Sequence, residues 1–133
     1  MKEIIKDGLV LARHITKDDI KDGLNFFSKD EDFIQVGVWG NYEKDKDLKA
    51  HIHNVVERTS NRTYETLYIM NGSIEVTIYT LSEEVVDKFD VKQGEILVLL
   101  ECGHGYRIKE DGTYVLEVKN GPYFGAEIDR RRI

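Results

Sequence analysis

The chain of 133 residues contains one cysteine, one proline and no long apolar segment. The single cysteine, Cys102, cannot form an internal disulfide and is typical of a reducing compartment. The longest uninterrupted apolar run extends only from Ile96 to Leu100, which is too short to cross a lipid bilayer. Charged residues stand near the N-terminus, where a signal peptide would need apolar ones. We therefore expect a cytoplasmic protein that does not interact with a membrane.

Positive charge is also scarce, because 25 acidic residues outnumber 19 basic ones and the net charge is −6. This balance argues against a nucleic-acid partner, since binding to phosphates requires a basic surface. Hydrophobic residues make up 41% of the chain and charged residues 33%, as in an ordinary folded protein. The length predicts a single domain, residues 1–133, with a core of its own.

Short runs of alternating apolar and polar residues, separated by turn residues, predict a protein built mainly from strands. The expected strands are residues 3–5, 9–12, 33–39, 48–56, 64–70, 73–79, 85–89, 95–100, 104–109 and 113–118. One short N-terminal helix is expected from Thr16, with Asp19 completing a capping box and Ile20, Leu24 and Phe27 on one face. Asn71-Gly72 and residues 110–112 predict hairpin turns. The pattern is typical of an all-β barrel or jelly roll.

Two histidines stand two positions apart in the expected strand 48–56. Side chains alternate between the faces of a strand, so His51 and His53 would project in the same direction. Glu65, at the start of the next strand, would add a carboxylate, and such a group of side chains can chelate a metal. A polar stripe on a solvated strand is the alternative interpretation of the histidine pair.

A second stretch begins at Gly94, continues through the apolar run and ends at His104. The two stretches together resemble the motifs of the cupin superfamily: His51-x-His53 with Glu65 six intervening residues before Gly72, and then Gly94 followed by His104. The sequence departs from the family pattern at several positions. The gap between His53 and Glu65 is longer than usual, which makes Glu57 a rival fourth ligand, and Cys102 stands where the second motif has glycine.

The resemblance implies a double-stranded β-helix, the cupin jelly-roll barrel, over residues 33–120. Residues 1–30 would then be an N-terminal extension and 121–133 a C-terminal tail. His51, His53, Glu65 and His104 would bind Fe, Mn, Ni or Zn inside one end of the barrel. A metal-free cavity that uses the same residues as bases or hydrogen-bonding groups is the alternative.

Four further residues are candidates for the surroundings of this site. Tyr106 and Cys102 flank His104 at two positions on either side, and we expect Tyr106 to line the cavity as a proton donor. Cys102 is either a substrate-contacting thiol or a small buried residue. Arg58 and Arg62 would meet an anionic substrate at the barrel mouth or remain solvated. His14 has no partner in the pattern, and we expect it on the surface.

The resemblance favours an enzyme that acts on a small polar molecule, with a sugar or nucleotide-sugar as the specific expectation. Isomerase or epimerase chemistry would use His53 as the base and Tyr106 as the acid. A non-catalytic metal- or metabolite-binding module, a metal-free nucleotide-sugar isomerase and a catalytically inactive subunit are the alternatives. Exposed strand edges further predict a homodimer.

Overall fold

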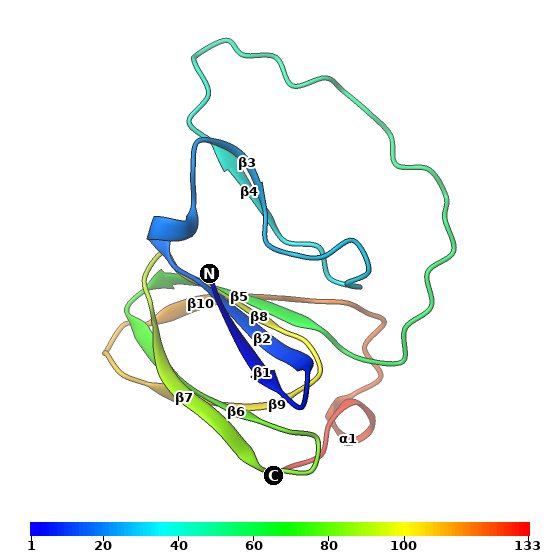
Figure 1. The fold of residues 1–133 in the computed structure, drawn as a ribbon, viewed down its shortest axis with the longest axis vertical. Coiled ribbons are helices and arrows are strands. Elements are labelled where there is room, and N and C mark those ends of the chain that lie inside the picture. Colours follow the sequence, from blue (N-terminus) through cyan, green and yellow to red (C-terminus); the bar gives the residue numbers. More distant parts are fainter.

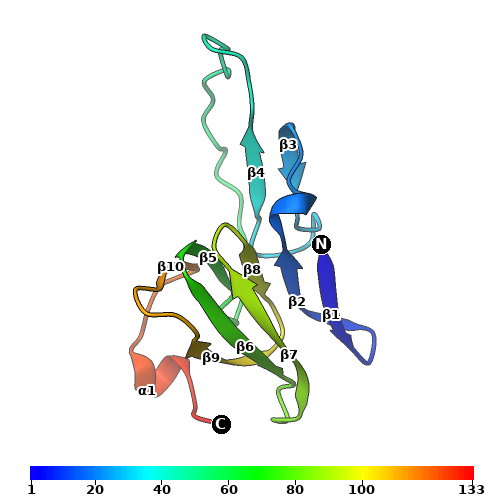
Figure 2. The same cartoon turned by 90° about the vertical axis from the view of Figure 1, so that its left-hand side faces the viewer.

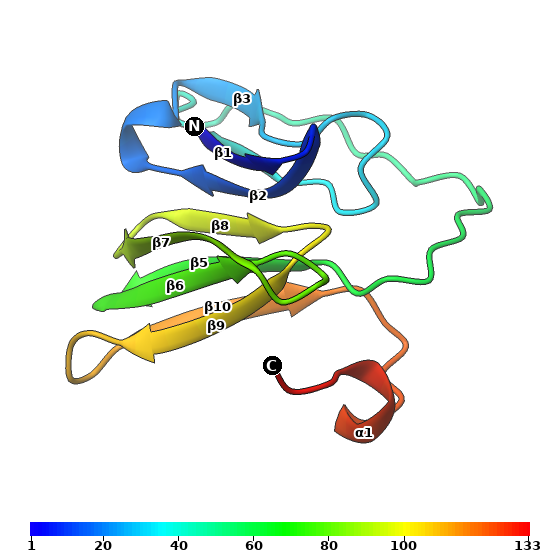
Figure 3. The same cartoon turned by 60° about the horizontal axis from the view of Figure 1, so that its bottom comes forward.

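The computed structural model describes all residues, 1–133, and the chain is mostly β-structure. Its elements are β1 (Lys2–Lys6), β2 (Leu9–Ile15), the 3₁₀ turn η1 (Lys17–Asp19), β3 (Gly23–Phe26), β4 (Gly37–Gly40), β5 (Glu65–Asn71), β6 (Ser73–Tyr79), β7 (Val85–Lys92), β8 (Ile96–Leu99), β9 (Gly103–Ile108), β10 (Tyr114–Lys119) and α1 (Ala126–Asp129). Five strands form one sheet in the order β1-β2-β8-β5-β10, and three form a second in the order β7-β6-β9. The two sheets lie face to face without closing into a barrel, and β3 and β4 form a separate ribbon (Figures 1 and 3). The all-β prediction is thus confirmed.

The main core lies between the two sheets. Alternation along β6 turns Ile74, Val76 and Ile78 inward, where they are at most 2% exposed, and Leu67 and Ile69 of β5 meet them from the larger sheet. A second, smaller cluster covers part of the opposite face of the larger sheet, which we call its outer face. Its buried members are Ile15, Phe27, Tyr64, Ile96, Val98 and Leu100. The larger sheet is therefore apolar on both faces.

The two sides of the sandwich differ. On one side, the edge strands β1 and β7 are joined by ion pairs: Lys2 Nζ lies 2.6 Å from Asp87 Oδ2, and Lys6 Nζ lies 2.8 Å from Glu84 Oε1. On the other side, the edge strands are β9 and β10, and no backbone ladder joins them. The two sides of the sandwich are therefore held by different contacts.

The strands on either side of both predicted hairpin turns are present, but they do not pair with each other, so the two hairpin predictions are wrong. β5 pairs with β8 and β10, whereas β6 pairs with β7 and β9, so Gly72 carries the chain from one sheet to the other. Residues 109–113 do the same between β9 and β10. The two corners bind each other, because Asn71 donates to the Gly112 carbonyl oxygen at 2.9 Å and the Lys109 N–H donates to the Ser73 carbonyl oxygen at 3.1 Å.

The predicted N-terminal helix is reduced to the single turn η1. The Thr16–Asp19 capping box is present, as expected. Gly23 then adopts φ +84, outside the helical region, and the side chain of Asn25 bonds the backbone of Lys21 at both its N–H and its carbonyl oxygen. These bonds replace those of a helix, and Leu24 becomes part of β3. The one short α-helix lies instead near the C-terminus.

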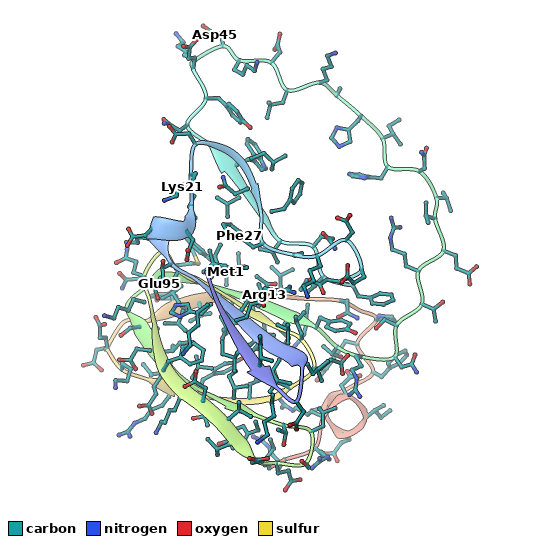
Figure 4. The ribbon with its side chains drawn as sticks, in the orientation of Figure 1. Met1, Arg13, Lys21, Phe27, Asp45 and Glu95 are labelled. Carbon is teal, nitrogen blue, oxygen red and sulfur yellow. The ribbon has the colours of Figure 1, made fainter.

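The predicted strand 48–56 is also wrong. Residues 41–63 form no helix or strand, and every one of them is exposed (Figure 1). This segment, which we call the long loop, arches away from the sheets, and Asp45 marks its outer end (Figure 4). Its aliphatic residues stay exposed: Ile52, for example, is 93% exposed. Of the expected strand 33–39, only residues from Gly37 onward pair, as β4 with β3.

The segment expected as an N-terminal extension is built into the fold, since β2 pairs with β8 within the larger sheet. Its Arg13 is 1% exposed and donates to Glu3 Oε1 at 2.9 Å and Asp32 Oδ2 at 2.5 Å, which ties the loop after β3 to the sheet (Figure 4). In the C-terminal tail, Arg131 donates to the Leu81 carbonyl oxygen at 2.9 Å. None of the helices is both long and apolar enough to cross a membrane.

We expect Gly72→Ala to destabilise the protein by about 3 kcal/mol, because φ is +76 there and a Cβ would lie 3.0 Å from Thr113 Cα at the paired corners. Gly8→Ala is the matched control: φ is +79, but nothing lies within 4 Å of the added atom, so about 1 kcal/mol is expected. Urea denaturation measures both. Equal losses would mean that the corner contact contributes nothing beyond the backbone conformation.

Candidate functional site

A polar contact inside the sandwich joins Glu65 to His104. Glu65 begins β5 and faces inward from the larger sheet, and His104 faces it from β9, where it pairs with the buried Ile78. Glu65 Oε2 lies 3.3 Å from His104 Nε2. The side chains are only 12% and 28% exposed, respectively. Two residues 39 positions apart in the sequence are thus brought together by the facing of the two sheets.

Two atoms of this pair are buried without a hydrogen-bond partner, Glu65 Oε2 and His104 Nδ1. Most buried polar atoms in proteins are satisfied, so two orphaned atoms on one contacting pair mark a place where a further group would be stabilised. The adjacent His104 lowers the pKa of Glu65 despite the opposing effect of burial. Glu65 is therefore a carboxylate at neutral pH, suited to ligate a cation.

Tyr106 on β9 and Lys119 on β10 complete the surroundings of the pair. The Tyr106 ring stacks on His104 with centroids 5.2 Å apart, and burial and the nearby Glu65 raise the pKa of its hydroxyl. Tyr106 therefore stays protonated at neutral pH and can serve as a hydrogen-bond donor. Lys119 on β10 is directly opposite Glu65 in the strand register, and its Nζ lies 3.7 Å from Glu65 Oε1. The group combines an acid, a carboxylate, an imidazole and a cation.

His51 and His53 lie apart from this group, on the exposed long loop. Their rings are close to each other, with centroids 5.0 Å apart and planes nearly perpendicular. Glu57 and Arg58 lie on the same loop, where Arg58 donates to the Val56 carbonyl oxygen at 3.2 Å. The four predicted ligands therefore fall into two pairs. Nowhere in the chain do three or more His, Cys, Asp or Glu side chains gather in a position to hold a metal ion.

Arg62 lies at the base of the long loop and pairs with Glu101, with Nε 2.5 Å from Oε2. It lines a surface hollow of about 440 Å³ together with Phe33 and Tyr64, whose rings are nearly parallel at 6.0 Å. A second hollow of about 340 Å³ shares Phe33 and Tyr64 and extends to Arg13. Tyr64 belongs to the cluster on the outer face, whereas Glu65 faces into the sandwich.

Cys102 is only partly exposed and packs against the main core. Burial raises the pKa of its thiol to about 12, so it is protonated at neutral pH and a poor nucleophile. These features match the interpretation of Cys102 as a small buried residue.

One residue of the site, Lys119, was missed by the sequence analysis, although the alternation along 114–119 places it on the same face as Glu117 and the β5–β10 register then aligns it with Glu65.

Outside the site, the expectation of a solvated His14 is wrong: its Nε2 lies 2.8 Å from Glu95 Oε2, and its ring stacks on Phe89 at 5.2 Å. Only the pairing of β2 with β8 and the folding of β7 reveal that contact.

Comparison with protein-family models, with curated proteins and with solved structures finds no match to this chain. The resemblance to cupins stays a prediction, and the arguments below rest on the geometry of the site.

We expect Cys102 to be nearly inert toward thiol reagents in the native protein. With a pKa of about 12, roughly one thiol in 10⁴ is ionised at pH 8, against about a quarter for an ordinary cysteine. Labelling of EDTA-treated protein with a chromogenic disulfide should be about a thousandfold slower than in denaturant, where one thiol per chain reacts. Rapid stoichiometric labelling of the native protein would contradict the described burial.

Proposed function

We propose that this chain is a small metal-binding protein of cupin-like architecture that acts on a small polar metabolite. Glu65 and His104 are the anchoring ligands for a divalent transition metal, and His51 and His53 on the long loop complete the site. The observation that carries the proposal is the Glu65–His104 contact with its two orphaned atoms, Oε2 and Nδ1.

The donor atoms of this pair fit a transition metal. Imidazole nitrogen and carboxylate oxygen are ligands for Fe, Mn, Ni and Zn, and each residue of the pair has one buried atom that is still without a partner. Glu65 is already ionised in the fold, because His104 lowers its pKa. Lys119 Nζ lies 3.7 Å from the other carboxylate oxygen of Glu65, Oε1, and its positive charge reduces the net negative charge around the pair.

The long loop is able to deliver the remaining histidines. It joins β5 directly before Glu65, and the eleven residues between His53 and Glu65 span up to roughly 40 Å when extended. Loops of this length without secondary structure are uncommon unless they serve a function. Closure of the loop would also bury apolar residues such as Ile52 and Val55, which now meet only solvent.

Tyr106 is 41% exposed beside the Glu65–His104 pair, which supports access for a substrate and so favours an enzyme over a closed sensor site. Its hydroxyl keeps its proton and would act as the acid, and His53 would act as the base once the loop has closed. Arg58 and Arg62 lie on the loop itself and would attract an anionic group. This combination suits isomerase or epimerase chemistry on a sugar or nucleotide-sugar.

The strand order supports the jelly-roll part of the proposal. From β5 to β10 the chain passes between the two facing sheets at Gly72, between β7 and β8, between β8 and β9, and after β9. Repeated crossing of this kind is the feature that distinguishes a jelly roll from a sandwich of hairpins.

A second candidate is metal-free acid–base catalysis by the same group. His104 and Glu65 contact each other directly at 3.3 Å, as a base and the carboxylate that orients it would, and Tyr106 stands beside them as an acid. This function needs neither His51 nor His53.

Protein produced in medium supplemented with Fe, Mn, Ni and Zn should contain close to one equivalent of transition metal by elemental analysis. Glu65→Gln, His104→Ala and the double variant His51→Ala/His53→Ala should each lower the content at least tenfold, because each removes ligands from one site. Glu57→Gln, in the same loop, is the matched control and should retain the metal. No metal in the wild-type protein would reject the metal site and favour the second candidate, and loss with Glu57→Gln alone would transfer the ligand role to Glu57.

A further inference from the structure

Other segments of the chain cover only part of the outer face of the larger sheet. Ile96 and Val98 of β8 are buried there beneath residues that include Val36 and Val38. Toward the sheet edge, the same face continues across β5 and β10 and stays exposed. The apolar side chains of this uncovered part, which we call the edge patch, are Tyr68, Met70, Tyr114, Leu116 and Val118.

The strand register makes the edge patch continuous. Leu116 pairs with Tyr68, and Val118 pairs with Thr66, so the outward side chains of β10 lie beside those of β5. Their inward neighbours Val115 and Glu117 pair with the inward-facing Ile69 and Leu67. An edge strand with a row of apolar side chains on its open face is a surface that soluble proteins usually cover.

The β3–β4 ribbon presents a second uncovered apolar surface, which we call the ribbon patch. Leu24 pairs with Trp39, and Phe26 lies on the same face as Leu24, two positions further along β3. All three are more than half exposed, whereas Val38 on the other face packs into the outer cluster. The ribbon extends beyond the end of the sheets (Figure 2), while its Val38 side packs against the outer cluster. A two-stranded ribbon gains stability from packing, and the face with Leu24, Phe26 and Trp39 has none from its own sheets.

We infer that the occupant of both surfaces is a second copy of this chain, with the ribbon patch of each chain seated on the edge patch of the other. A two-fold dimer uses the same two surfaces twice, so a chain that carries both leaves neither uncovered. The eight side chains are between 42% and 69% exposed. An aromatic side chain has a total surface of about 150–250 Å², so at these exposed fractions the eight side chains together expose roughly 900 Å² per chain. A standard interface buries about 800 Å² per partner.

Sedimentation velocity at 5–100 µM tests this arrangement, which does not depend on bound metal. The wild-type protein should have twice the 15.4 kDa mass of one chain. Leu116→Glu in the edge patch and Trp39→Lys in the ribbon patch should each give monomers, because every dimer would bury two unpaired charges. We expect the dissociation constant of the dimer to rise at least a hundredfold for each variant. Val85→Glu is the matched control, since Val85 is 57% exposed on β7 outside both patches, and it should stay dimeric.

Mixing the two monomeric variants separates this geometry from other dimers. An equimolar mixture of Leu116→Glu and Trp39→Lys should form a heterodimer, in which one contact is unchanged and the other pairs Lys with Glu. Met70→Glu with Phe26→Lys repeats the test if circular dichroism shows that either first variant is misfolded. Three outcomes would overturn the inference: a monomeric wild-type protein at 100 µM, dimers that survive either substitution, or a mixture that stays monomeric. The last outcome would indicate that each patch contacts the same patch of a second copy, or that the patches bind another partner.

Discussion

The paired corners at Gly72 and at residues 109–113 constrain the rest of the sandwich. Each carries the chain from one sheet to the other, and the bonds between Asn71, Ser73 and the second corner hold the two crossings together. Because β5 and β9 are thereby fixed on facing sheets, Glu65 and His104 meet inside although they are far apart in the sequence. The position of the site is thus a consequence of how the chain turns its corners.

The residues of the candidate site lie on two different kinds of structure, paired strands and an exposed loop. Glu65 and His104 lie on paired strands, whereas His51 and His53 lie on a loop that is exposed throughout. The proposed site would therefore need the loop to close over it, as loops do over small molecules in many enzymes. The same chain leaves apolar surface on the long loop, on the ribbon and on β10, so closure of the loop and pairing of two copies would both proceed with burial of apolar area.

Much of the fold could be predicted from local pattern. Alternating residues located β6 to the residue, and Thr16 with Asp19 did form a capping box. The predictions that failed depended on distant partners. Asn71-Gly72 reads as a hairpin because a turn signal is local, yet the choice between pairing β6 with β5 or with β9 is made by packing in the core. The alternation of His51 and His53 predicted a strand, but no neighbouring strand pairs with residues 48–56. Lys119 and His14 acquire their partners only through strand register.

Nitrogen-15 NMR of the histidine rings tests the central claim most directly, because the chain has only four histidines. On addition of one equivalent of Zn²⁺ to metal-free protein, the rings of His51, His53 and His104 should shift together, as ligands of one ion do. His14, held by Glu95, should not move and serves as the internal control. Shifts confined to His51 and His53 would show that the loop binds zinc by itself, and an unmoved His104 would contradict a metal site anchored inside the sandwich.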